Sequence, residues 1–122
     1  MAVTLDLELY RNDTTVFDVE ITEGMLVRSD DNDPADLTGF TFAGEVRRSA
    51  DSTEILAEFV FDETNIADGT LRCILYPFEV ADLETHPGMW DLQVTSPDAT
   101  PFVTTTHRGV VTVVDDVTEN DG

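Results

Sequence analysis

The side chains that could carry out chemistry are one cysteine, two histidines and 26 carboxylates in a chain of 122 residues. Cys73 alternates with Leu71 and Leu75 on an apolar face, which predicts a buried thiol rather than an exposed nucleophile. Neither His86 nor His107 has a second ligand nearby at a spacing typical of a metal site. The sequence therefore predicts no catalytic residue, no metal and no cofactor.

The carboxylates dominate the charge of the chain. Against them stand six arginines and no lysine, so the formal net charge is −20. With so many acids, pairs that lie close together are expected by chance, and most should lie on a solvated surface. Such a charge repels nucleic acid and anionic membranes, which excludes them as partners. No apolar run approaches the ~20 residues of a membrane helix.

The kind of acid is also informative, because Asp outnumbers Glu by 16 to 10. Dense carboxylates without lysine are similar to the surfaces of salt-in halophile proteins, which stay hydrated when salt screens their repulsion. The alternative is a GC-rich genome combined with an acidic interface. We favour the halophile interpretation.

One acidic run has the composition of a calcium loop. Four carboxylates lie between Asp30 and Asp36, and clustered hard oxygen ligands suit Ca²⁺. The EF-hand spacing fails, because Ala35 stands where a third ligand belongs. A hydrated loop is the favoured interpretation, with calcium binding left open.

The elements that would position these groups are mainly strands, because apolar and polar residues alternate along most of the chain. Asn12-Asp13 and Asp68-Gly69 indicate turns. Pro77 to Glu84 is the one candidate for a short helical turn, and a break is expected near His107. The predicted strands cover residues 3–10, 15–22, 40–47, 55–62, 70–76, 89–95 and 102–114, with a short one at 25–27.

Seven or eight short strands separated by turns are typical of an all-β fold. We predict a single antiparallel β-sandwich, Ig-like, over residues 1–114, followed by an acidic C-terminal tail at 115–122. Apolar residues on the inward phase should be mostly buried. They are Leu5, Leu7, Phe17, Val19, Phe42, Val46, Phe59, Leu71, Cys73, Trp90, Leu92 and Val111.

The order of several short motifs resembles a known family. The motifs are Leu5-Asp6-Leu7-Glu8-Leu9-Tyr10, Asp36-Leu37-Thr38-Gly39-Phe40-Thr41-Phe42, Asp68-Gly69-Thr70-Leu71, Met89-Trp90-Asp91-Leu92-Gln93-Val94-Thr95 and Arg108-Gly109-Val110-Val111-Thr112-Val113. In this order they resemble the small β-sandwich virion modules of tailed viruses, similar to the N-terminal domain of phage upper-baseplate proteins. The chain departs from that pattern by an insertion at residues 28–34 and by the lack of a following fibre domain.

The resemblance implies a non-enzymatic virion structural protein, an adaptor in the tail or baseplate that docks onto other virion proteins. The alternative within this class is a capsid decoration (cement) protein that bridges capsid subunits. Multiple copies per particle are expected, located in the virion. The first residues lack the basic and then apolar order of a signal peptide, so assembly is expected in the host cytoplasm.

Docking would use unpaired strand edges and loops. The contact segments expected are residues 2–9, the loop 28–36 and the tail 115–122. Arg47 and Arg48 are adjacent and should point to opposite faces of a strand, one paired inside the domain and the other free for a partner. The candidate contact residues are Tyr10, Arg28, Asp30, Asp31, Asp33, Arg47, Arg48, Phe78, Asp115 and Asp116.

Two other classes of function are compatible with a small acidic sandwich. An enzyme or small-ligand binder would need a deep apolar pocket, for example one that holds His86 or His107 with two carboxylates. A free-standing cytoplasmic halophile protein with an Ig-like fold would need no virion partner.

Overall fold

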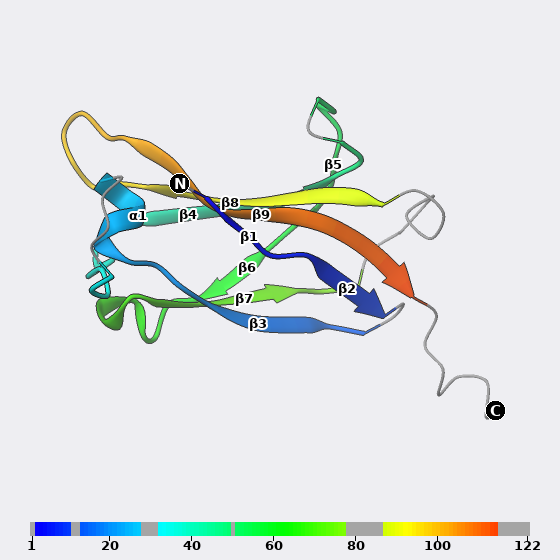
Figure 1. Ribbon diagram of the computed structural model, residues 1–122, viewed down its shortest axis with the longest axis horizontal. Coiled ribbons are helices and arrows are strands. Elements are labelled where there is room, and N and C mark those ends of the chain that lie inside the picture. The colour runs from blue at the N-terminus through cyan, green and yellow to red at the C-terminus, as the bar shows by residue number, and fades with distance from the viewer. Residues whose placement is uncertain (1, 11–12, 28–31, 50, 78–86, 115–122) are drawn as a thin grey trace.

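Two β-sheets stacked face to face make up the fold in the computed structural model (Figure 1). The structure describes residues 2–10, 13–27, 32–49, 51–77 and 87–114. Within them the elements are β1 (Val3–Thr4), β2 (Leu7–Tyr10), β3 (Thr15–Glu20), α1 (Glu23–Val27), β4 (Thr41–Arg47), β5 (Ile55–Glu58), β6 (Val60–Asp62), the 3-10 helix η1 (Ile66–Asp68), β7 (Thr70–Leu75), β8 (Gly88–Thr95) and β9 (Val103–Val114). The predicted all-β, Ig-like sandwich is confirmed.

The strand order explains the resemblance to immunoglobulin sandwiches. The large sheet runs β1-β9-β8-β4-β5, with β2 also paired to β9, and the small sheet runs β3-β7-β6. This order matches the two sheets of an Ig sandwich, except that the first strand lies wholly in the large sheet. The prediction differs in two respects: the described residues form nine strands, and β1 and β2 pair with β9 in parallel.

The first predicted strand is interrupted where it crosses Gly109. The Leu5 amide donates to the Arg108 carbonyl at 2.8 Å, and the Val110 amide donates to Asp6 Oδ1 at 2.9 Å. A Cβ on Gly109 would lie 2.0 Å from the Leu5 oxygen, so glycine permits this approach. Leu5 leaves the ladder here and is 37% exposed, so its predicted burial is wrong.

The predicted strand over residues 55–62 divides between the two sheets. Ile55–Glu58 pairs with β4, and Val60–Asp62 pairs with β7. Phe59 lies at the crossing, with its amide bonded to the Gly44 carbonyl at 2.9 Å and its ring buried. One residue thus joins the sheets at this edge.

The predicted short strand at residues 25–27 is a helical turn, α1. The Met25 amide lies 3.3 Å from the Thr22 hydroxyl oxygen, which accepts its hydrogen bond as an N-terminal cap. Glu23 lies in the first turn, where a negative charge is favourable. A run of three apolar residues is compatible with either a strand or a helix. Here the hydrogen bond from Met25 to Thr22 favours the helical turn.

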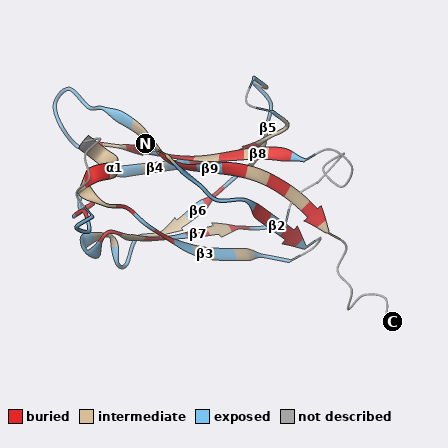
Figure 2. Ribbon diagram, in the orientation of Figure 1, coloured by how far each residue is buried: buried red, intermediate tan, exposed pale blue. Residues whose placement is uncertain are grey.

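The core lies between the sheets, and its buried residues come mainly from β2, β8 and β9 of the large sheet and from β7 of the small sheet (Figure 2). Trp90, 2% exposed, packs edge-on against Phe17 and lies 5.6 Å from Phe59 between ring centroids. Phe17 and Phe42 are only partly buried against this core. Burial is confirmed for Leu7, Val19, Val46, Phe59, Leu71, Cys73, Trp90, Leu92 and Val111.

Two further predictions concern turns and breaks. Gly69 adopts φ 80° after η1, which confirms the Asp68-Gly69 turn. The break expected near His107 is a register shift within a continuous β9, where Leu92 pairs with His107 and Gln93 with Thr105. Of the predicted helical turn at residues 77–84, only Pro77 is described. The predicted tail at 115–122 lies outside the described residues.

In the part of the chain that the structure describes, no helix could span a membrane.

Candidate functional site

A depression of about 440 Å³ lies on the outer face of the large sheet. Residues of β4, β8 and β9 at neighbouring register positions form most of it, and Ala2 and Ser49 complete the lining. Its polar lining consists of Glu45, Arg47, Ser49, Asp91, Gln93, Thr105 and Arg108. Pockets for small ligands have a similar volume but a mainly apolar lining, so this depression is better suited to polar groups.

A row of charged residues crosses the large sheet through this depression. Glu58 of β5 pairs in register with Glu45 of β4, Glu45 with Asp91 of β8, and Asp91 with Arg108 of β9. Residues directly opposite one another share a face of the sheet and lie close together. Three carboxylates in succession are unfavourable, and cations near the row offset part of that repulsion.

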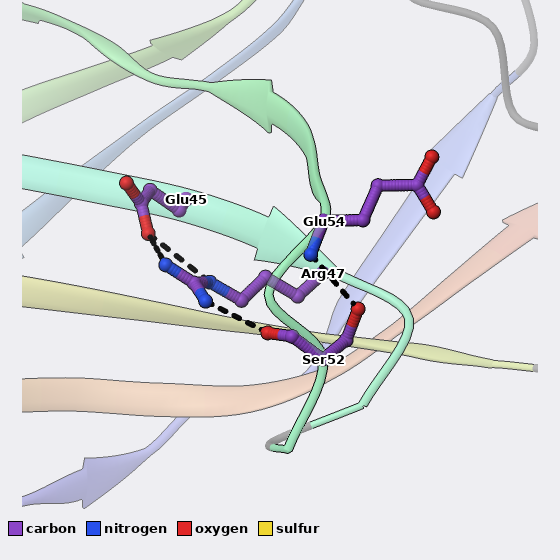
Figure 3. A network of polar contacts seen from close by, with 4 residues as sticks. All are labelled: Glu45, Arg47, Ser52 and Glu54. Carbon is purple, nitrogen blue, oxygen red and sulfur yellow. Dashed lines mark hydrogen bonds and ion pairs between the residues drawn. The ribbon is translucent and has the colours of Figure 1, made fainter.

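Arg47 is the cation that this arrangement fixes most firmly (Figure 3). Its guanidinium donates two hydrogen bonds to Glu45, one of them from Nε at 3.1 Å, and a third to the Ser52 carbonyl at 2.7 Å. The hydrogen bond with Glu45 raises the pKa of Arg47 above its ordinary value. The predicted pairing of one of the two adjacent arginines inside the domain is therefore confirmed for Arg47.

Asp91 is the half-buried carboxylate of the row. Burial is the main cause that raises its pKa, the neighbouring Glu45 adds to the effect, and Arg47 opposes it. No described residue donates a hydrogen bond to the Asp91 carboxylate. A half-buried carboxylate without a donor gains most from a cation or N–H group brought to it from outside.

Arg108 lies at the other end of the depression. Its side chain is exposed, and alone among the arginines of the described residues it forms no ion pair or hydrogen bond. Arg108 and Asp91 therefore present opposite charges side by side, each with unused hydrogen-bonding capacity. A partner surface that places a basic group against Asp91 and an acidic group against Arg108 would match them.

The groups with catalytic potential lie elsewhere. Cys73 is 1% exposed and burial raises its thiol pKa to about 12, which confirms the predicted buried thiol. His107 is 4% exposed, its Nδ1 lies 2.9 Å from the Thr106 hydroxyl, and burial lowers its pKa to about 4. His86 lies outside the described residues. Within those residues, no three His, Cys, Asp or Glu side chains are grouped to hold a metal.

Four of the ten predicted contact residues fall in the described structure: Tyr10, Asp33, Arg47 and Arg48. Of these, only Arg47 lines the depression. Tyr10 is exposed at the end of β2, with its hydroxyl 3.2 Å from Glu8. The predicted contacts Arg28, Asp30, Asp31, Phe78, Asp115 and Asp116 lie outside the described residues.

The expectation that Arg48 is left free for a partner is wrong. Arg48 Nε lies 3.3 Å from Glu54 Oε1. Arg48 follows the last residue of β4, so the alternation of a strand does not place it, and the loop to β5 returns Glu54 beside it. Its contact with a partner stays a prediction.

The acidic loop is only partly described. Asp33 is exposed, and its main-chain carbonyl accepts a hydrogen bond from the Glu23 amide at 2.9 Å. Asp36 Oδ1 accepts from the amide and hydroxyl of Thr38, at 3.0 and 2.6 Å, which lowers the pKa of Asp36. Asp30 and Asp31 lie outside the described residues, so the calcium alternative stays untested.

Sequence reasoning missed Glu45, Asp91 and Arg108. One signal was available for Asp91, a charged residue that the alternation of Trp90 and Leu92 places on the outward face of the strand. That signal is weak in a chain with 26 acids. The neighbourhood of Asp91 and Arg108 follows from the register of β8 and β9, which alternation along one strand does not reveal.

No protein-family model matches the chain, and no curated protein matches it in sequence.

Proposed function

We propose that this chain is a non-enzymatic structural protein of a tailed virus, an adaptor in the tail or baseplate that docks onto other virion proteins. The motif order supports the class of protein. A fold by itself selects no function, so the site has to carry the argument for docking.

The observation that carries docking is the pairing of Asp91 with Arg108 on the outer face of the large sheet. Among the described residues, Asp91 is a half-buried carboxylate to which none donates a hydrogen bond, and Arg108 is an exposed guanidinium that forms an ion pair with none. Protein interfaces use complementary charges of this kind to fix register and select partners. Arg47 lies in the same depression, with its guanidinium hydrogen-bonded to Glu45 and to the Ser52 carbonyl.

A ligand-binding enzyme is less well supported by the same face. The two hydroxyl side chains of the depression, Ser49 and Thr105, form no hydrogen bond to a carboxylate that could act as a base, within the residues that the structure describes. Its lining of charged and polar groups fits the polar surface of a macromolecule better than a small apolar molecule.

The direct test is the composition of purified particles of the virus that encodes this chain. Quantitative mass spectrometry should find the chain at a fixed copy number relative to the major capsid protein. Density from electron cryomicroscopy would then place it at the tail and baseplate or on the capsid surface, and the latter position would assign the decoration function instead. Absence from purified particles would overturn the proposal.

A complementation assay tests the face itself. A virus that lacks the gene is supplied with the wild-type chain, Arg108→Gln, or Thr100→Glu, an exposed loop change with the same effect on net charge. We expect Arg108→Gln to lower incorporation at least about tenfold, as the loss of one member of an interfacial charge pair does. Thr100→Glu should be incorporated normally. Normal incorporation of Arg108→Gln would assign docking to another surface.

A further inference from the structure

The small sheet has an edge that the rest of the described chain leaves unpaired. β3 pairs with β7 on one side, and no described strand pairs with its other side. In constant-type Ig sandwiches the first strand of the chain occupies this position, beside the second. Here both β1 and β2 pair with β9 in the large sheet, so that position beside β3 is not filled by them.

The outward face of β3 presents one apolar side chain followed by two acidic ones. Val16, Asp18 and Glu20 are exposed on it, and Val16 is 53% exposed. Val16 begins an apolar row across the sheet, because it pairs in register with Ile74 of β7, which pairs with Val60 of β6. Val60 is 48% exposed, so this row leaves apolar surface in contact with water.

The next row is charged. Asp18 Oδ1 accepts a hydrogen bond of 2.9 Å from Arg72 Nε, and this contact lowers the pKa of Asp18. Arg72 approaches from the β7 side, and no other cation of the described residues pairs with Asp18. Within the same residues the Glu20 carboxylate forms no ion pair or hydrogen bond.

These charges decide which strand could add to the edge. If a second copy paired with β3 in antiparallel fashion about Asp18, it would place Asp18 against Asp18, and a parallel in-register copy would also place Glu20 against Glu20. Like charges directly opposite one another destabilise a sheet, and both copies carry −20. A strand with basic residues would instead place a positive charge opposite Asp18 and another opposite Glu20, which is favourable.

We infer that the outer edge of β3 receives a β-strand donated by a partner protein, with an apolar residue opposite Val16 and basic residues opposite Asp18 and Glu20. Main-chain hydrogen bonds to β3 supply the general attraction, and the alternating side chains select the partner. The added apolar residue extends the row of Val16, Ile74 and Val60. The inference rests on the proposed function only in taking the partner to be a protein.

The test uses the full chain labelled with ¹⁵N and short peptides, at about 0.5 M NaCl to suppress non-specific attraction of cations. The probes are acetyl-Thr-Thr-Lys-Thr-Lys-Thr-Ile-Thr-Thr-amide and its reversed sequence, which cover antiparallel and parallel addition. A peptide of the same composition with adjacent lysines is the control for net charge. One probe should shift the amide signals of β3 and bind at least about tenfold more tightly than the control.

A charge exchange separates strand addition from general electrostatics. Glu20→Lys should weaken the lysine probe about tenfold and favour a probe with glutamate opposite position 20. Asp98→Lys, an exposed loop change with the same effect on net charge, should leave both affinities unchanged. Thermal unfolding of each variant checks that it folds.

Three results would overturn the inference: equal binding of the control peptide, shifts that map away from β3, or concentration-dependent self-association through β3. The peptide assay needs no virion. Its failure therefore leaves docking through Asp91 and Arg108 standing, and failure of Arg108→Gln to affect incorporation leaves the strand-addition result intact.

Discussion

The indole N–H of Trp90 donates a 2.7 Å hydrogen bond to the main-chain carbonyl of Leu5, across 85 residues of sequence. This bond ties the outermost segment of the large sheet to the centre of the core. It also satisfies a carbonyl where the first strand leaves the ladder.

Substitutions at Trp90 should separate packing from this hydrogen bond. We expect Trp90→Ala to lower the free energy of unfolding by about 3–5 kcal/mol, because a large core aromatic is lost. Trp90→Phe keeps most of the aromatic packing and removes the donor, which should cost about 1–2 kcal/mol. Urea unfolding measures both, and equal losses for the two variants would show that the indole N–H, not the ring, dominates.

Gly109 should be intolerant of even one added carbon. A Cβ there would lie 2.0 Å from the Leu5 oxygen and 3.0 Å from Asp6 Oδ1, so the first strand must move. We expect Gly109→Ala to cost about 1–3 kcal/mol and to speed amide exchange at Leu5 and Val110. Asp6→Ala should speed exchange at Val110 as well, whereas Asp6→Asn keeps the acceptor and should not. Unchanged exchange in Gly109→Ala would contradict the close crossing.

His107 should make stability depend on pH. Its pKa is about 4 in the folded state and about 6.5 when unfolded, so between these values the unfolded chain binds more protons. Its contribution is therefore complete above pH 6.5 and is lost as the pH falls to 4, by about 3 kcal/mol.

The carboxylates titrate in part of the same range, so the effect of His107 is measured as a difference. The free energy of unfolding of the wild type minus that of His107→Gln should fall by this amount between pH 7 and pH 4. A difference that stays constant with pH would show that His107 is not buried in its neutral form.

Salt should stabilise the folded chain. Repulsion among charges that sum to −20 opposes compaction, and the screening length falls from ~30 Å at 0.01 M to ~3 Å at 1 M. The thermal midpoint should therefore rise between 0.05 and 3 M NaCl. Sulfate at matched ionic strength separates screening from strengthened apolar burial, because sulfate is excluded more from the protein surface. A flat or falling midpoint would remove the halophile interpretation and leave the virion proposal unaffected.

The parts of the fold that could be predicted are those governed by alternation along one strand. Trp90, Leu92 and Val111 lie on the expected inward phase, because the core needs a dry face on each strand. The exception, Leu5, fits the same pattern in sequence. Its exposure depends on Gly109, which lies more than a hundred residues away, and no local pattern encodes that contact.

The candidate site also combines residues that a local pattern predicts with residues that only the pairing of distant strands brings together. One of the adjacent residues Arg47 and Arg48 was predicted to be paired inside the domain, without a choice between them. In the structure Arg47 is held by Glu45 and Ser52, and Arg48 is paired as well. Asp91 and Arg108 meet only through the register of β8 and β9. That register includes a shift between Leu92 and Gln93, which depends on three-dimensional packing rather than on composition.

The parallel pairing of β2 with β9 has a consequence for biosynthesis. Leu7 pairs with Val111, so the two strands meet only after nearly every other element has been translated. Contacts of such long separation are formed slowly, and an emerging chain generally folds by domains rather than by strands. β2 therefore remains unpaired until the ribosome has synthesised β9. During that interval Leu7 and Leu9, buried in the finished molecule, remain available to chaperones and to neighbouring nascent chains.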